Sequence, residues 1–330
     1  MTMRLLLTGY PGWLANRFVE TLVQYPTPMT SVRCLINSEL SGNIPSVPGL
    51  EFVRGNIVRP ESLKGAAEGV DVVVHAAGVL HVRRIRDFYS INRDGTRHLL
   101  EAAAKAGVRR FIHISSNAAQ GFCAGKGFEL DESGPCRPES HYGKSKYEAE
   151  EVVREFQRAG KMETVILRPA MFYGPPVPPR HLDIYRKIRR GYFPVFGHGN
   201  YQRSITFIDH LVQAIHLAVQ HPAAAGQTYY IADREIPTLN EILDAMGEAL
   251  GRKPVKIHLP AFLACVAHIL DEVLAACDRY WMLPHLVGES CKNIACRITK
   301  AETELGYNPA THYREGYKKT IAWCREKGLL

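Results

Sequence analysis

The sequence predicts an α/β fold: a doubly wound parallel sheet of the Rossmann type, with a smaller mixed α/β substrate lobe. Two observations favour this fold class. Short β-branched or leucine-rich segments alternate with helical patterns through the N-terminal half, which is typical of parallel strands joined by right-handed crossovers. These segments also lack polar residues at alternate positions, so we expect helices on both faces of the sheet.

The predicted elements follow one another in a regular order. Six strands are predicted at "RLLLTG", "VRCLIN", "LEFVRG", "VDVVVHAAG", "RRFIHISS" and "ETVILRP". Helices are predicted between them near 13–24, 61–68, 91–106 and 141–159. The prolines of "GPPVPP" then interrupt the pattern, because proline cannot continue a strand or a helix. The remainder mixes helices, near 238–250 and 261–276, with strand candidates such as "QTYYIAD".

This order divides the chain into two parts. We assign residues 1–170 with 201–233 to a dinucleotide-binding domain. Residues 171–200 with 234–330 form the predicted substrate-binding lobe. No internal repeat is visible.

Composition restricts the classes of function. The chain has 330 residues and a net charge of +8, from 41 basic and 33 acidic residues. Because the basic residues are scattered, this balance favours a surface that attracts an anionic cofactor over a nucleic-acid site. The eight cysteines form no C-x-x-C pair and no metal-ligand spacing, which indicates reduced thiols in a cytoplasmic protein. His75, His113 and His141 also lack metal-ligand spacing and are assigned packing or surface roles.

The most hydrophobic segment is "LPAFLACVAHILDEVLAAC", residues 259–277. His268, Asp271 and Glu272 interrupt it before it could span a bilayer. Three interpretations stay open: a lid over a pocket, a core helix, or a helix that lies on a membrane surface and makes peripheral contact. The N-terminal apolar run is too short for a secretory signal.

A glycine turn follows the first strand. "LLLTGYPGWLANRF" places Gly9, Gly12 and Ala15 at the start of a helix. Small residues there let backbone N–H groups approach a pyrophosphate at the positive helix end. The spacing alone is a weak pattern, and a plain tight turn is the alternative. The strand-then-helix context favours dinucleotide binding.

A tyrosine and a lysine in "HYGKSKYEAEE" provide candidate acid–base chemistry. Tyr142 and Lys146 are four positions apart and share one helix face. A phenol has a pKa of about 10, and an adjacent ammonium group should lower it. The pattern is common by chance, but "HISSN" supplies Ser115 and Ser116 at a strand end that faces the cofactor crevice. A serine hydroxyl there can donate to a substrate oxygen.

The motifs "TGYPGWLA", "HAAG", "ISSN", "YGKSK" and "LRPAMFYGP" together resemble the extended branch of the short-chain dehydrogenase/reductase superfamily. The resemblance covers essentially the whole chain. It implies that Tyr142 is the acid–base residue, Lys146 its partner and Ser116 the donor to the substrate oxygen. It also implies that Ser115 packs under the nicotinamide and that Asn92 has a partly structural role.

The cofactor-binding residues are predicted from their positions at the strand ends and from this resemblance. They are Gly9, Gly12, Trp13, Leu14, Asn37, Ser38, Asn56, Ile57, Ala76, Ala77, Gly78, Ser115, Tyr142, Lys146 and Pro169. No metal ligand is predicted.

The chain departs from the family pattern in ways that concern cofactor and substrate. The second strand ends in Ile36, Asn37 and Ser38, where many members have an acid that binds the ribose 2′-hydroxyl. No carboxylate repels a 2′-phosphate there, which favours NADP, with NAD as the alternative. Met171 and Gln120 replace an asparagine and a tyrosine of nucleotide-sugar epimerases and dehydratases. Met171, Phe172 and residues 262–274 indicate an apolar pocket, with core packing as the alternative.

The leading hypothesis is an NAD(P)-dependent oxidoreductase that transfers a hydride between the nicotinamide and a bulky, mainly apolar ketone or alcohol. In this it resembles 3β-hydroxysteroid dehydrogenase and dihydroflavonol-reductase-like members. The first alternative is a nucleotide-sugar epimerase or dehydratase that uses bound NAD transiently, for which Arg203 could bind a diphosphate. The second is a non-catalytic NAD(P)-binding regulator, against which the presence of Tyr142, Lys146 and Ser116 argues. We expect a small-molecule substrate, no nucleic-acid partner and a homodimer formed through the helices near 91–106 and 141–159.

Overall fold

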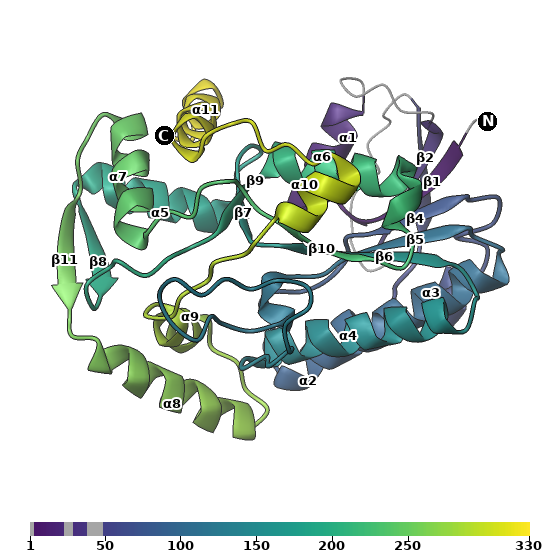
Figure 1. Cartoon of the computed structure of the whole chain (residues 1–330), viewed down its shortest axis with the longest axis horizontal. Coiled ribbons are helices and arrows are strands. Elements are labelled where there is room, and N and C mark those ends of the chain that lie inside the picture. Colours follow the sequence, from purple (N-terminus) through teal and green to yellow (C-terminus); the bar gives the residue numbers. More distant parts are fainter. Residues whose placement is uncertain (1–2, 23–28, 38–48) are drawn as a thin grey trace.

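A seven-stranded, wholly parallel sheet forms the centre of the protein (Figure 1). The computed structural model describes residues 3–22, 29–37 and 49–330. In sheet order the strands are β10 (Thr228–Ile231), β6 (Glu163–Pro169), β5 (Arg110–Ile114), β4 (Val72–His75), β1 (Met3–Tyr10), β2 (Met29–Ile36) and β3 (Leu50–Arg54). The order reverses between β1 and β4, which is where ligands bind in doubly wound sheets.

Helices cover both faces of this sheet, as the apolar strands require. Side chains alternate along β1, so Leu5 and Leu7 pack on one face and Leu6 packs on the other. The first face carries α1 (Trp13–Thr21), α6 (Ile208–Gln220) and α10 (Thr299–Leu305), and the second carries α3 (Gly95–Lys105) and α4 (His141–Arg158). Figure 1 shows these two layers above and below the strands. The predicted fold class is confirmed.

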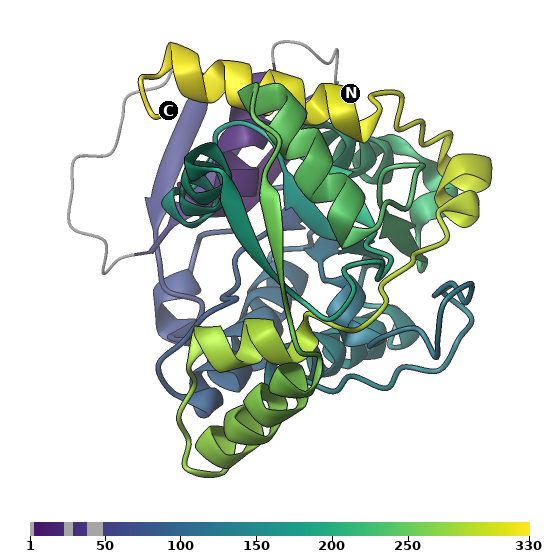
Figure 2. The ribbon, with the colours of Figure 1, turned by 90° about the vertical axis from the view of Figure 1, so that its left-hand side faces the viewer.

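A smaller lobe lies at the carboxyl ends of the strands and has its own hydrophobic core. Two pairs of parallel strands, β7 with β9 and β8 with β11, contribute to it. Its elements are β7 (Met171–Tyr173), α5 (Pro179–Arg190), β8 (Tyr192–Phe196), β9 (Ile205–Phe207), α7 (Leu239–Leu250), β11 (Val255–Leu259), α8 (Phe262–Ala276), α9 (Met282–Glu289) and α11 (Tyr313–Glu326). Figure 2 shows α8 and α9 as a pair at the bottom of the view, well apart from α7 and α11.

The six predicted strands are confirmed, and "QTYYIAD" forms the edge strand β10. The helix predicted at 61–68 is wrong, because only the 3-10 helix η1 (Pro60–Leu63) forms there. Gly65, inside the predicted range, has a φ of +79°, which a right-handed helix does not allow. The helix predicted near 91–106 is α3 preceded by a π-helical turn, η2 (Tyr89–Asp94).

The remaining short elements connect the larger ones. They are α2 (Ile85–Phe88), η3 (Asn117–Ala119) and η4 (Pro222–Ala224). The two-domain division stays a prediction. Ala301 and Leu305 of α10 pack in the core of the sheet domain, although the division assigns them to the smaller lobe. Among the described residues, none of the helices combines the length and apolarity that crossing a membrane requires.

Candidate cofactor and active site

The turn between β1 and α1 requires glycine at two positions. Gly9 has a φ of +91°, and a Cβ on it would lie 2.8 Å from the backbone carbonyl carbon of Ala76. The Gly12 N–H donates a hydrogen bond to the Gly9 carbonyl at 2.6 Å, and a Cβ on Gly12 would meet that oxygen at the same distance. Thr8 Oγ1 accepts a bond from the Ala77 N–H at 3.1 Å. The turn therefore lies directly against the end of β4.

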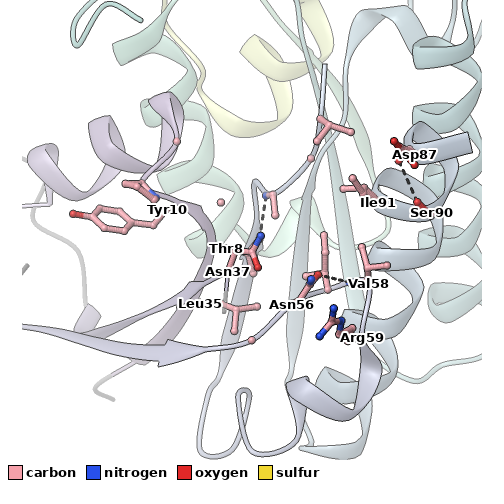
Figure 3. A pocket seen from close by; sticks show the side chains of 18 residues that line it. Thr8, Tyr10, Leu35, Asn37, Asn56, Val58, Arg59, Asp87, Ser90 and Ile91 are labelled. Atoms are coloured by element: carbon pink, nitrogen blue, oxygen red, sulfur yellow. Dashed lines mark hydrogen bonds between the residues drawn. The ribbon is translucent and has the colours of Figure 1, made fainter. Parts of the chain in front are cut away.

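A cavity of about 550 Å³ opens beside this turn (Figure 3). Its volume lies within the range of about 300–1,000 Å³ that is typical of small-molecule sites. Seven predicted cofactor-binding residues line it: Gly9, Gly12, Asn37, Asn56, Ile57, Ala77 and Gly78. Sequence reasoning missed other lining residues, among them Tyr10, Arg59, Asp87, Ser90 and Ile91. The glycine turn and the size of the cavity fit a dinucleotide cofactor.

The walls of the cavity bear on the choice between NAD and NADP. Asn37 follows β2 and lines the cavity, as does Arg59 from the segment after β3. Asp87 of α2 is the acidic residue among the lining residues. Asn56 is oriented by its own loop, because its Oδ1 accepts a bond from the Val58 N–H at 2.9 Å. Ser38 lies outside the described residues.

Ser116 and Tyr142 are brought together by two short turns. Ser116 follows β5 and caps η3, where its Oγ accepts a bond from the Ala118 N–H at 3.2 Å. Tyr142 lies in the first turn of α4, which Ser140 caps through the Gly143 N–H. Gly143 faces the Ala118 carbonyl so closely that a Cβ would collide with it. This close approach places the Tyr142 phenol within hydrogen-bonding range of the Ser116 side chain.

The electrostatics of Tyr142 differ from the prediction. Burial raises the pKa of the Tyr142 phenol, and the Ser116 hydrogen bond and the positive charge of Arg180 offset this only in part. The expectation that Lys146 lowers this pKa is wrong, because the lysine amine is directed elsewhere. Its Nζ donates to the Ile114 carbonyl at 2.8 Å and lies 3.4 Å from His113 Nε2. Burial lowers the pKa of Lys146 to about 8.

Two buried histidines surround Lys146, and sequence reasoning gave them only packing roles. His75 lies between the hydroxyls of Thr8, at 2.8 Å, and Thr96, at 3.0 Å. Burial and the charge of Lys146 lower the pKa of His75 to about 3, and that of His113 also lies well below its ordinary value. Both imidazoles are therefore neutral near neutral pH. They give the lysine a polar environment that adds no charge.

Ser115 belongs to a buried ionic network. Its Oγ donates to Glu150 Oε1 at 2.5 Å, and Glu150 also binds Arg168 through two bonds at 2.9 and 2.7 Å. Gln120 accepts a bond from Arg168 at 3.1 Å and another from the Tyr230 hydroxyl. The Ser115 hydroxyl is thus held by Glu150, and a contact of Ser115 with the nicotinamide stays a prediction.

The other predicted residues have mixed placements. The Asn92 side-chain amide donates to the Val79 carbonyl at 3.1 Å and accepts a bond from the Val79 N–H at 2.8 Å. It also donates to Ser145 Oγ at 3.0 Å. This fits its structural role. Trp13 directs its indole N–H to the Gly174 carbonyl at 3.2 Å, so its side chain contacts the smaller lobe. Leu14 is buried in the core, and Pro169 pairs with Ile231 at the end of β6.

Two aromatic side chains extend from Tyr142, and a separate ring pair joins Phe172 to Trp13. The Tyr142 ring lies 6.0 Å from that of Phe88, which in turn lies 5.3 Å from the ring of Tyr280. The Tyr280 hydroxyl is 2.9 Å from His81 Nδ1. The ring of Phe172 lies 4.8 Å from that of Trp13. Sequence reasoning singled out Phe172 here but missed Phe88, His81 and Tyr280, because they come from separate segments without a shared motif.

Two residues named from the sequence for substrate contacts have distinct environments. Met171 is 53% exposed, so its side chain is not part of the core. Arg203 donates to the carbonyls of Glu289 and Ser290, at 2.7 and 2.8 Å, and thereby holds the C-terminal end of α9. Arg180, which the sequence did not point to, is exposed at the start of α5 and lies within electrostatic range of Tyr142.

Comparison with known proteins agrees with this geometry. The family model described as "NAD dependent epimerase/dehydratase family" matches residues 5–232. The chain belongs to this family. The predicted membership of the extended short-chain dehydrogenase/reductase group is therefore confirmed. Members of the epimerase/dehydratase family are NAD-dependent enzymes, including epimerases, dehydratases and dehydrogenases.

Several relatives match this family member over nearly the full length of both chains. The uncharacterized protein y4nL of Sinorhizobium fredii is 35% identical, over 98% of this chain and 95% of its own. The UDP-glucose 4-epimerase of Vibrio cholerae is 27% identical, with 97% and 95% covered. A 4-hydroxy-2-methyl-3-oxo-4-farnesyl-3,4-dihydroquinoline-1-oxide ketoreductase of Stigmatella aurantiaca is also 27% identical, with 95% and 94% covered.

A solved structure supports the same assignment. The dTDP-glucose 4,6-dehydratase DesIV of Streptomyces venezuelae, with NAD and TYD bound, has a TM-score of 0.78 and 27% identity. The match covers 98% of this chain and 97% of that one.

Proposed function

We propose that this protein is an NAD(P)-dependent oxidoreductase that reduces the carbonyl of a bulky, mainly apolar small molecule to an alcohol. The observation that carries the proposal is the pairing of Ser116 and Tyr142 at the carboxyl end of β5, the strand next to β4, because the segment after β4 lines a cavity that fits a dinucleotide. Ligands of doubly wound sheets bind at this edge.

The residues have distinct roles in the proposed reaction. When bound, a reduced nicotinamide supplies the hydride that adds to the carbonyl carbon. The Tyr142 hydroxyl donates its proton to the carbonyl oxygen, while the Ser116 hydroxyl donates a hydrogen bond to the same atom. Because the pKa of Tyr142 is raised, the phenol holds its proton near neutral pH, which is the state that this step needs. Lys146 would hold the ribose of a bound cofactor.

The surroundings of Tyr142 support an apolar substrate. The rings of Phe88 and Tyr280 extend from Tyr142 as aromatic surface. The Trp13–Phe172 ring pair and the exposed Met171 add aromatic and thioether surface between α1 and the smaller lobe. The ketoreductase of Stigmatella aurantiaca acts on a farnesylated compound, as its name states. We infer NADP as the preferred cofactor, because Asn37 and Arg59 both line the cavity and can donate to a 2′-phosphate.

A second candidate function is epimerisation or dehydration of a nucleotide sugar with transiently used NAD. The guanidinium of Arg180 near Tyr142 favours it, since a cation there can bind a diphosphate. The similarity to a UDP-glucose 4-epimerase and to a dTDP-glucose 4,6-dehydratase also supports it. In this chain Arg203, the arginine named from the sequence, is already bound to the end of α9.

One experiment separates the two candidates. The purified protein is incubated with NADPH or NADH and steroid or aromatic ketones, and in parallel with UDP- and dTDP-hexoses, and both nicotinamide absorbance and products are followed. Stoichiometric loss of NADPH with a ketone, abolished in Tyr142→Phe while cofactor binding persists, supports the reductase. Conversion of a nucleotide sugar without net cofactor consumption would replace it with the second candidate.

A further inference from the structure

The pair of helices α8 and α9 exposes an unusual amount of apolar surface. Nine of the sixteen large hydrophobic side chains that are exposed in the described residues lie between positions 262 and 286. We call them the α8–α9 face. Its members are Phe262, Val266, Ile269, Leu270, Val273, Trp281, Met282, Leu283 and Leu286. Such a concentration marks an interaction surface, because soluble monomers rarely expose large contiguous apolar patches.

The face is a continuous stripe along α8. Each of its five members on this helix lies three or four residues from at least one other member, so they share one side. Ala264 is the buried residue of α8, and it lies about half a turn away from the middle of the stripe. Figure 1 shows α8 along the lower margin of the molecule, away from the sheet. The helix therefore attaches to the protein by one side and presents its apolar side outward.

Polar side chains of the same helices point inward. His285 of α9 is buried and lies 2.9 Å from Asp271 of α8, with Glu289 at 3.6 Å on its other ring nitrogen. Gly288 packs against the backbone of His268. This arrangement fixes α8 on α9 through polar contacts and close packing. It reverses the usual pattern of a surface helix, in which the outer side is polar.

Cationic side chains border the face. Arg83 and Arg84 are exposed, and the Arg83 carbonyl accepts a bond from the Tyr280 N–H at 3.2 Å, which places this segment beside the start of α9. Arg279 is also exposed, two residues before Trp281. Arg86 pairs with Asp278 at 3.2 Å, whereas no acidic residue of the described chain forms an ion pair with Arg83 or Arg279. An anionic surface would complement this border.

We propose that the α8–α9 face lies on a lipid bilayer that carries anionic headgroups. The 15-residue helix α8 is about 22 Å long, too short to span a bilayer but suited to lie in its interface. Trp281 is of the type enriched at headgroup depth, and the bordering arginines contact the phosphates. A second copy of this chain would bring the same arginines together, whereas anionic lipids neutralise them.

This placement connects the membrane to the candidate active site. The segment between α8 and α9 contributes Tyr280, which contacts His81 and Phe88, and Phe88 lies beside Tyr142. A substrate with an apolar tail would thus reach Tyr142 from the lipid side. Docking itself does not depend on the reaction, so its test uses binding alone.

Vesicle flotation of the full-length protein tests the proposal. We compare vesicles of phosphatidylcholine with vesicles of equal amounts of phosphatidylcholine and phosphatidylglycerol. The protein should float with the mixed vesicles, and added salt should weaken this binding. Ile269→Glu with Val273→Glu should lower the partition coefficient by at least about tenfold. Arg83→Glu with Arg279→Glu should weaken binding to the mixed vesicles only.

Matched controls keep the result interpretable. Val255→Glu with Ile257→Glu removes exposed apolar groups on β11, and Lys318→Glu with Lys319→Glu removes exposed charges on α11. Both should bind vesicles as the unaltered protein does. Every variant should keep the thermal stabilisation by NADP⁺ or NAD⁺ that the unaltered protein shows. The proposal is overturned if the protein stays unbound, if the α8 variant binds normally, or if the face instead mediates self-association in solution.

Discussion

The buried pair of Arg168 and Glu150 should be the most sensitive ionic contact near the site. The two side chains are 1% and 0% exposed, and both oxygens of Glu150 accept bonds from Arg168. Arg168→Met removes the cation and leaves the carboxylate with Arg154, at 2.8 Å, as its remaining cationic partner. Breaking a fully buried pair costs about 3–5 kcal/mol, and the partly exposed Arg154 places the expected loss of unfolding free energy near the lower end.

Urea unfolding followed by circular dichroism measures this loss, and Arg97→Met serves as the control. Arg97 pairs with Glu155 on the same helix α4, also at 2.9 Å, but both side chains are exposed. The unfolding free energy of the control variant should fall by less than about 1 kcal/mol. The double variant Arg168→Met with Glu150→Gln should be more stable than Arg168→Met alone, because no unpaired charge remains buried. An Arg168→Met variant as stable as the control would refute this reasoning.

The same pair sets a pH dependence. Burial would raise the pKa of Glu150, but Arg168, Arg154 and Ser115 together lower it below its ordinary value. The pair therefore stabilises the fold above the pKa of an unfolded glutamate, about 4.3, and this stabilisation is lost as the pH falls through the lower folded pKa. In the Arg168→Met variant, the unfolding free energy should begin to fall at a higher pH than in the unaltered protein.

Three further predictions concern the candidate site. Gly9→Ala should abolish the thermal stabilisation of the protein by a dinucleotide, because Gly9 has a φ of +91° and the new Cβ would lie 2.8 Å from the backbone of Ala76. A melting temperature that still rises normally with the dinucleotide would contradict the assignment of this turn to cofactor binding. Arg59→Ala should weaken the binding of NADP⁺ more than the binding of NAD⁺, as measured by titration. Equal losses of affinity for the two cofactors would show that Arg59 does not select between them. The kcat/KM of carbonyl reduction should stay level near neutral pH and fall only above the ordinary phenol pKa of about 10, because the raised pKa keeps Tyr142 protonated. A fall of kcat/KM near pH 7 would show that another group donates the proton.

Local patterns were enough to predict the sheet and the glycine turn. Each apolar segment forms its strand, and Gly9 and Gly12 occupy the turn because their neighbours in the sequence determine it. The predicted helix at 61–68 did not form, since Gly65 adopts a positive φ in the middle of it although the surrounding residues favour a helix. The helix α5 was missed because its prolines suggested only an interruption, yet Pro179 occupies its first turn, where proline is tolerated.

The site was predictable only where a motif is contiguous. Tyr142 and Lys146 share one helix and were found from their spacing. Phe88, Tyr280 and Arg180 reach the same place from three distant segments, so no local pattern could join them. The direction of a side chain was also beyond the sequence, as Ser115 shows: it sits next to Ser116 but turns its hydroxyl to Glu150.

Burial explains why the electrostatic part of the sequence prediction was wrong and what replaces it. Spacing suggested an ammonium group that acidifies a phenol, but a dry environment disfavours the charged form of both groups. It raises the pKa of Tyr142 and lowers that of Lys146 to about 8. A phenol in this state releases its proton only when negative charge develops on a nearby oxygen, as on a carbonyl that is being reduced. The raised pKa of Tyr142 fits the acid role that we propose for it, and Lys146, whose amine is bound to the Ile114 carbonyl, does not tune the phenol.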